Sequence, residues 1–125
     1  MIDIKTVSNS ALAYLGDSVI EVLVREHLVK KGLSSSAHLN SEALKYVRAS
    51  AQSEAMKNII DLLSEEEEAA YRRGRNMGHT STPKSASVSE YRTATGMEAL
   101  FGWLHLSGKT ERMHELFAAA YKLEE

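Results

Sequence analysis

The chain has 125 residues, of which 43% are hydrophobic and 26% are charged, the balance of one soluble globular domain with its own core. It contains no cysteine, which excludes disulfides and thiolate metal sites. Because 15 basic side chains face 17 acidic ones, the net charge is −2, and any surface that binds nucleic acid must be a local one.

The N-terminus lacks the apolar segment of a signal peptide, and no apolar stretch is long enough to span a bilayer. We therefore expect a single domain, residues 1–125, that is cytoplasmic and makes no membrane contact. Apolar residues three or four apart predict a first helix from about 8–10 to 30–31. Gly32 follows two lysines, as is typical of a helix C-terminus. The apolar positions of this helix are Leu12, Leu15, Val19, Val22 and Leu23.

Three more helical segments are predicted between residue 34 and Gly74. Serines 34–36 are candidate N-caps for a second helix, and the chain is expected to break near Ser50 before a third. Ser64 and Glu67 have the spacing of a capping box, which predicts a short helix that ends near Gly74. The residues expected to face inward are Leu39, Ala43, Tyr46 and Val47 in the second helix and Ala55, Met56, Ile59, Ile60 and Leu63 in the third.

Residues 76–89 are rich in hydroxyl side chains and contain the only proline, so we expect one long loop there. Helix resumes around Glu90 and runs to about Leu106, where Ser-Gly breaks it. Thr110 is expected to cap a last helix. Its predicted inner residues are Met113, Leu116, Phe117, Ala120 and Tyr121. The fold class is therefore all-α, a bundle of six or seven helices.

Three glycines lie inside predicted helices next to two acidic residues. Gly16 precedes Asp17, and Gly96 and Gly102 flank Glu98. Each such glycine costs roughly 1 kcal/mol relative to alanine. Either the helices simply tolerate them, or they allow two helix backbones to approach closely. The second alternative gives the hypothesis that Asp17 and Glu98 meet in one site.

Both carboxylates have apolar neighbours, and a buried carboxylate is unfavourable unless it is paired or binds a cation. One interpretation is an ion pair with an arginine such as Arg25 or Arg92. The other is a site for a hard cation such as Mg²⁺, which takes one or two carboxylates and keeps several waters. Such an ion can activate water and stabilise the leaving oxygen in phosphodiester hydrolysis.

Four segments resemble one known family. Residues 15–21, Leu-Gly-Asp-Ser-Val-Ile-Glu, resemble the ribonuclease III signature, whose core is Leu-Gly-Asp-Ala-Val. Residues 95–102, Thr-Gly-Met-Glu-Ala-Leu-Phe-Gly, resemble the second motif of that family. Residues 71–76 and 90–96 look like its compact branch, Mini-ribonuclease III. The resemblance covers nearly the whole chain, in order and with matching spacing.

The resemblance implies a magnesium-dependent helical endonuclease domain that works as a homodimer. Two active sites along a valley would each cut one strand of double-stranded RNA. Asp17 and Glu98 match catalytic, metal-binding carboxylates of the family. The branch has no separate double-stranded-RNA-binding domain. Because its members trim precursor 23S ribosomal RNA, the resemblance implies the same substrate for this chain. Whether a ribosomal protein presents the RNA stays open.

The chain departs from the full-length enzymes at two positions. Those enzymes carry Glu four residues before the signature Asp and Asp three residues before the second-motif Glu, where this chain has Ala13 and Thr95. The number of metal ions therefore stays open, as does assistance from Glu21 or Glu90. The departure also leaves an alternative function, a catalytically inactive RNA-binding factor in ribosome assembly on the same fold.

A basic cluster precedes the predicted long loop. It is either a solvated charged turn or a surface for RNA phosphates, and the resemblance favours the second. Duplex RNA is recognised mainly by shape, through phosphates and 2′-hydroxyls. The predicted RNA-binding residues are Arg72, Arg73, Arg75, Asn76, Lys84 and Arg92.

Overall fold

The computed structural model describes residues 2–77 and 87–123, and every regular element in these two ranges is helical. The helices are α1 (Asn9–Lys30), α2 (Ser36–Val47), α3 (Ala49–Ile59), α4 (Glu65–Arg75), α5 (Val88–Leu106) and α6 (Thr110–Tyr121), with 3₁₀ turns at Ile4–Thr6 and Ile60–Leu62. The expected all-α class is confirmed. None of the helices in the described ranges is both long and apolar enough to cross a membrane.

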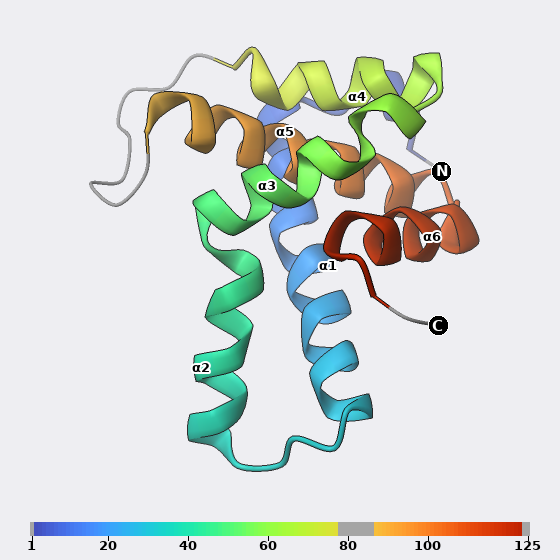
Figure 1. Ribbon diagram of the computed structural model, residues 1–125. Coiled ribbons are helices and arrows are strands. Elements are labelled where there is room, and N and C mark those ends of the chain that lie inside the picture. The colour runs from blue at the N-terminus through green and yellow to red at the C-terminus, as the bar shows by residue number, and fades with distance from the viewer. Residues whose placement is uncertain (1, 78–86, 124–125) are drawn as a thin grey trace.

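Helix α5 is the centre of the molecule, since α1, α3, α4 and α6 all pack against it. Figure 1 shows that α1 crosses α5 in its N-terminal half and continues beside α2 as a two-helix arm. Helix α2 has no buried residue, because it packs on α1 along one side only. Its expected inward residues are consequently only partly buried.

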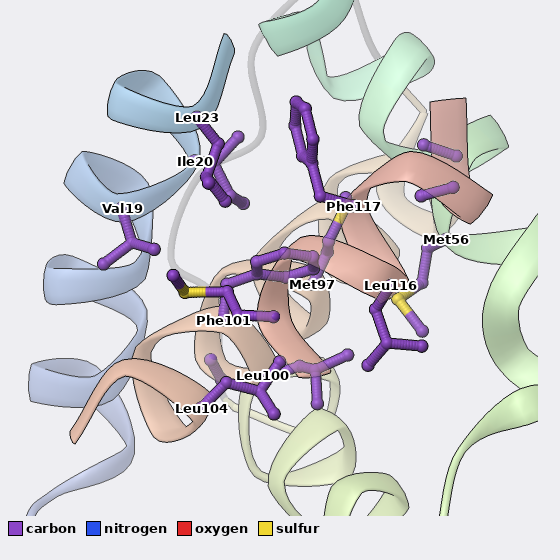
Figure 2. Packing of buried hydrophobic residues seen from close by; sticks show 14 of the residues in the cluster. Val19, Ile20, Leu23, Met56, Met97, Leu100, Phe101, Leu104, Leu116 and Phe117 are labelled. Carbon is purple, nitrogen blue, oxygen red and sulfur yellow. The ribbon is translucent and has the colours of Figure 1, made fainter. Parts of the chain in front are cut away.

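The core forms where four helices converge on α5. Every residue from Ala94 to Leu104 is buried except Glu98, which is half-buried. Figure 2 shows Leu100 and Phe101 among apolar side chains from α1, α3 and α6. Burying a side chain of this size contributes about 1.5–3 kcal/mol, so this contact region accounts for much of the stability. A carboxylate in the middle of such a helix is therefore an exception that calls for a reason.

The predicted helix ends are largely confirmed. Ser8 accepts a hydrogen bond from the backbone N–H of Ala11 at the start of α1, and Gly32 follows α1 with a φ of +94°. Ser64 and Glu67 form both halves of the capping box that starts α4. A second capping box, Ser87 with Glu90, starts α5 at Val88, two residues before the expected point.

Other local expectations differ in detail. The break between α2 and α3, expected near Ser50, lies two residues earlier at Arg48, whose ψ of 147° is extended. Thr110 is the first residue of α6, and the preceding Lys109 makes no side-chain capping bond. Val22, one of the apolar positions of the predicted first helix, is 62% exposed and lines a groove with Met113 of α6.

Candidate active site

Two glycines make the crossing of α1 and α5 possible. A Cβ atom added to Gly16 would lie 1.6 Å from the carbonyl oxygen of Glu98, and one added to Gly102 would lie 2.1 Å from that of Leu12. No side chain fits at such distances, so the hypothesis of close backbone approach is confirmed for both glycines. Gly96 serves a different crossing, since its Cβ would meet the ring of Tyr71 on α4.

The crossing brings Asp17 and Glu98 to one cleft. The cleft has a volume of about 230 Å³ and opens where the α2–α3 junction meets α1 and α5. Asp17 is exposed and Glu98 is half-buried. The cleft is lined by Asp17, Glu21, Val47, Ala49, Gln52, Tyr91, Ala94, Thr95 and Glu98. Residues 17 and 98, far apart in sequence, thus share one environment.

Negative charges on Asp17 and Glu98 repel each other. Burial, then the charge of Asp17, then a hydrogen bond to Asp17 raise the pKa of Glu98 to about 8. Among residues 2–77 and 87–123, neither carboxylate forms an ion pair with a lysine or arginine. Arg25, one of the expected partners, binds Glu21 instead at 3.2 Å. The pair therefore has excess negative charge.

Positions 13, 21, 90 and 95 determine whether further carboxylates reach the cleft. Thr95 lines the cleft, and its hydroxyl donates to the carbonyl oxygen of Tyr91 at 2.9 Å. Ala13 is buried and does not line the cleft. Glu21 does line it, whereas Glu90 accepts from the backbone N–H of Ser87 in the capping box. Of the two possible helpers, only Glu21 is thus placed at the site.

Gln52 is a cleft residue that the sequence analysis missed. Its side chain is 3% exposed, and Nε2 donates to the carbonyl oxygen of Val47 at 3.1 Å. Its other amide atom, Oε1, is buried without a hydrogen-bond partner among the described residues. The available signal was its register, because Gln52 precedes Ala55, Met56 and Ile59 on the apolar stripe of α3.

The predicted RNA-binding arginines of α4 differ in how they are engaged. Arg72 is exposed and pairs with Glu68 at 2.5 Å. Arg75 is exposed and donates to Asn76 at 3.1 Å. Arg73 is partly buried and donates to Asn9 at 2.7 Å and to the carbonyl oxygen of Val7. Arg73 therefore joins the end of α4 to the start of α1.

The other basic candidates lie beyond α4. Lys84 lies outside the described residues. Arg92 is exposed in the first turns of α5, next to Tyr91, which lines the cleft. The exposed arginines at positions 72, 75 and 92 are free to contact a large ligand at their outer faces. Their binding to RNA stays a prediction.

The described residues contain no group of three or more histidines and carboxylates suited to a metal ion. A metal at this cleft would therefore depend on two carboxylates, water and ligand oxygens. An all-helical domain in which two carboxylates share an open cleft is consistent with the class of metal-dependent phosphodiester hydrolases.

Comparison with known proteins places the chain within that class. The Ribonuclease III domain matches residues 10–109. A Mini-ribonuclease 3 of Thermoanaerobacter sp. is 42% identical over 120 residues, which cover 96% of this chain and 84% of the relative. A Mini-ribonuclease 3 of Symbiobacterium thermophilum is 44% identical over 109 residues, 87% of this chain and 84% of the relative. A crystal structure of a Fusobacterium nucleatum protein superposes with a TM-score of 0.85 at 32% identity, covering 98% of each chain.

The chain belongs to the ribonuclease III family and is an endoribonuclease. Its resemblance to the Mini-ribonuclease III branch is confirmed.

Proposed function

We propose that this endoribonuclease cuts double-stranded RNA, depends on Mg²⁺ and works as a homodimer. The observation that carries the proposal is the meeting of Asp17 and Glu98 in one cleft without a cationic side chain beside them. Membership of the ribonuclease III family indicates the reaction, and we assign the reaction to this cleft.

The donor set of the cleft fits a hard divalent cation. Carboxylate oxygens are the ligands that Mg²⁺ prefers, and it binds to proteins through only one or two of them. Burial first and the charge of Asp17 second raise the pKa of Glu98, and a bound cation would favour the ionised carboxylate. Asp17 and Glu98 would hold the ion, and how many ions bind is left open by Ala13 and Thr95. A bound ion would make a hydroxide available at neutral pH and stabilise the leaving oxygen.

The chain's own residues orient the substrate around this centre. The exposed guanidinium groups of Arg72, Arg75 and Arg92 match the geometry of phosphate oxygens. They are carried on α4 and α5, the helix that also carries Glu98. Contacts of this kind position a duplex through its phosphate backbone and do not depend on its base sequence.

The proposed homodimer is supported by an apolar groove on the outer side of α1. The groove has a volume of about 300 Å³, and Leu15, Val19 and Val22 of α1 line it opposite Met113 of α6. Val22 is 62% exposed in the single chain, as expected for a residue that a second copy covers. A dimer would also place two active sites on one RNA duplex, one for each strand.

The resemblance to Mini-ribonuclease III supports precursor 23S ribosomal RNA as the natural substrate. A cytoplasmic location follows from that substrate, and a ribosomal protein that presents the RNA is compatible with it. The site where purified protein cuts a ribosomal RNA precursor tests the assignment. Cleavage near the ends of mature 23S RNA is expected, and cleavage scattered along the precursor would contradict it.

An RNA-binding assembly factor without catalysis is the alternative that Ala13 and Thr95 raise, and membership of an endoribonuclease family argues against it. Incubation of the protein with a long RNA duplex separates the two functions. We expect cleavage in Mg²⁺ and none with excess EDTA. Binding without cleavage in any divalent metal would favour the alternative.

A further inference from the structure

We propose that Gln52 binds a ribose 2′-hydroxyl of the substrate and thereby makes the cleft selective for RNA. The inference rests on the proposed function, since it assumes that an RNA duplex enters the cleft. Gln52 is a specificity-determining residue in this account, whereas Asp17 and Glu98 carry the chemistry. Nothing in the ribonuclease activity itself requires an amide at this position.

The argument begins with an unsatisfied hydrogen-bond acceptor. Gln52 is 3% exposed, and its Oε1 has no partner in the described part of the chain. Leaving a buried polar atom unpaired costs about 1–3 kcal/mol, and native proteins rarely do so without a functional reason. The position is held firmly, because Nε2 of the same amide binds the carbonyl oxygen of Val47 at the α2–α3 junction.

None of the polar groups that line the cleft donates a hydrogen bond to this oxygen. Ionised Asp17 and Glu21 have only acceptor atoms. The hydroxyl hydrogen of Thr95 is used by the carbonyl oxygen of Tyr91. We assign the missing donor to a molecule that enters the cleft.

A ribose 2′-hydroxyl is the donor that fits the site best. It is the group that distinguishes RNA from DNA, and A-form duplexes display it along an open minor groove. The side chain of Gln52 already lines the cleft, and the terminal torsion of glutamine is soft. A small turn about this torsion, within the range that keeps the Nε2 bond to Val47, presents Oε1 to the bound strand beside the two carboxylates. The hydroxyl then supplies the hydrogen bond that the free protein lacks.

The test uses RNA duplexes that differ at one sugar. Single 2′-deoxy or 2′-fluoro nucleotides replace ribose in turn on both sides of the scissile phosphate, because fluorine keeps A-form geometry but cannot donate. For wild type we expect one position where both replacements lower kcat/KM about 3- to 10-fold, the size of one neutral hydrogen bond. In Gln52→Met this loss should vanish, while the all-ribose duplex is cut more slowly.

Two variants serve as controls. Ser53→Ala changes the neighbouring buried polar residue, which does not line the cleft, and should keep the position-specific loss. Gln52→Glu keeps an acceptor oxygen but loses the donor to Val47, so it should keep the loss even if it is less stable. Together they separate the contact with ribose from the support of the α2–α3 junction.

The outcomes are distinct. If Gln52→Met slows all duplexes by one factor and the position-specific loss persists, Gln52 is only structural or binds a water, and the proposal is wrong. If Gln52→Met does not fold, the scan with wild type and Gln52→Glu still decides, because the absence of any fluoro-sensitive position overturns the proposal. If wild type fails to cut the all-ribose duplex, the proposed function itself fails and this inference fails with it.

Discussion

The carboxyl group of Glu98 is hard to ionise, and the free energy of unfolding should therefore depend on pH. Its pKa is raised from 4.5 to about 8 by burial first and by Asp17 second. The unfolded chain releases this proton near pH 4.5, whereas the folded chain holds it up to about pH 8. In that window the folded state binds more protons, so this carboxyl lowers the free energy of unfolding as pH rises.

The first prediction concerns this carboxyl. In a metal-free buffer the Tm of wild type should fall between pH 5 and 8, and Glu98→Gln should flatten the decline and raise Tm at pH 8. Added Mg²⁺ should stabilise wild type increasingly with pH, because the ion binds the deprotonated carboxylate, and should not stabilise Glu98→Gln. Glu21→Gln, at the edge of the same cleft, is the control. An unchanged pH profile in Glu98→Gln would contradict the assignment.

The second prediction separates two neighbouring arginines. Arg73→Ala should lower the free energy of unfolding by about 1–3 kcal/mol, because its bonds to Asn9 and the Val7 carbonyl oxygen join two helices. Arg72→Ala should cost less than about 0.5 kcal/mol, because its pair with Glu68 is exposed. Arg72→Ala should instead weaken RNA binding and reduce its salt dependence. Urea melts and binding titrations at two salt concentrations decide, and the reverse pattern would exclude these roles.

Some of these residues could be predicted from the sequence and others could not. Asp17 and Glu98 stand out because carboxylates next to glycines in apolar helices are unfavourable without a site. Gln52 does not stand out as a site residue, since its register on the apolar stripe of α3 indicates burial but not the cleft that it lines. The bond between Arg73 and Asn9 joins positions 64 residues apart, and no local pattern reports such a contact.

At the scale of elements, the crossing of α1 and α5 determines whether the site exists. Gly16→Ala should cost about 3 kcal/mol or more, because the new methyl group would overlap the backbone of Glu98 and push the helices apart. Activity should be lost together with stability. Gly32→Ala is the matched control, since space is open there and only its φ of +94° opposes alanine, at about 1 kcal/mol. Equal losses in thermal melts would show that the crossing is not tight.

The element boundaries show why local patterns succeed and fail. The capping box at Ser64 was predicted, because the serine and Glu67 directly precede and begin a helical stretch. The matching pair at Ser87 and Glu90 was missed, because serine-rich segments are equally typical of loops and of N-caps. Thr110 was expected to cap α6, but the chain enters this helix one residue earlier without a side-chain cap.

At the scale of the whole molecule, the groove on α1 should hold a second copy of the chain. Val22→Glu should produce a folded monomer, since the side chain is 62% exposed in one chain and a charge there would oppose burial in a dimer. Cleavage of both strands should decline with the dimer. Val29→Glu changes an equally exposed residue outside the groove and should remain dimeric. A sedimentation experiment in which Val22→Glu is as dimeric as wild type would place the interface elsewhere.

The overall architecture was only partly predictable. Helical periodicity was enough for the all-α class, because the apolar residues recur every three or four positions. The arm of α1 and α2 was not predictable, since it depends on where α1 leaves the core and how the chain turns at Arg48. The junction of α2 and α3 places Val47 and Gln52 beside two carboxylates that are distant in sequence.

The central claim is that Asp17 and Glu98 form one catalytic site for RNA hydrolysis. The most direct measurement compares Asp17→Asn with wild type for cleavage of an RNA duplex in Mg²⁺, with duplex binding and Tm recorded on the same samples. The account predicts a variant that folds, binds the duplex and does not cut it. Cleavage by Asp17→Asn at the wild-type rate would contradict the account.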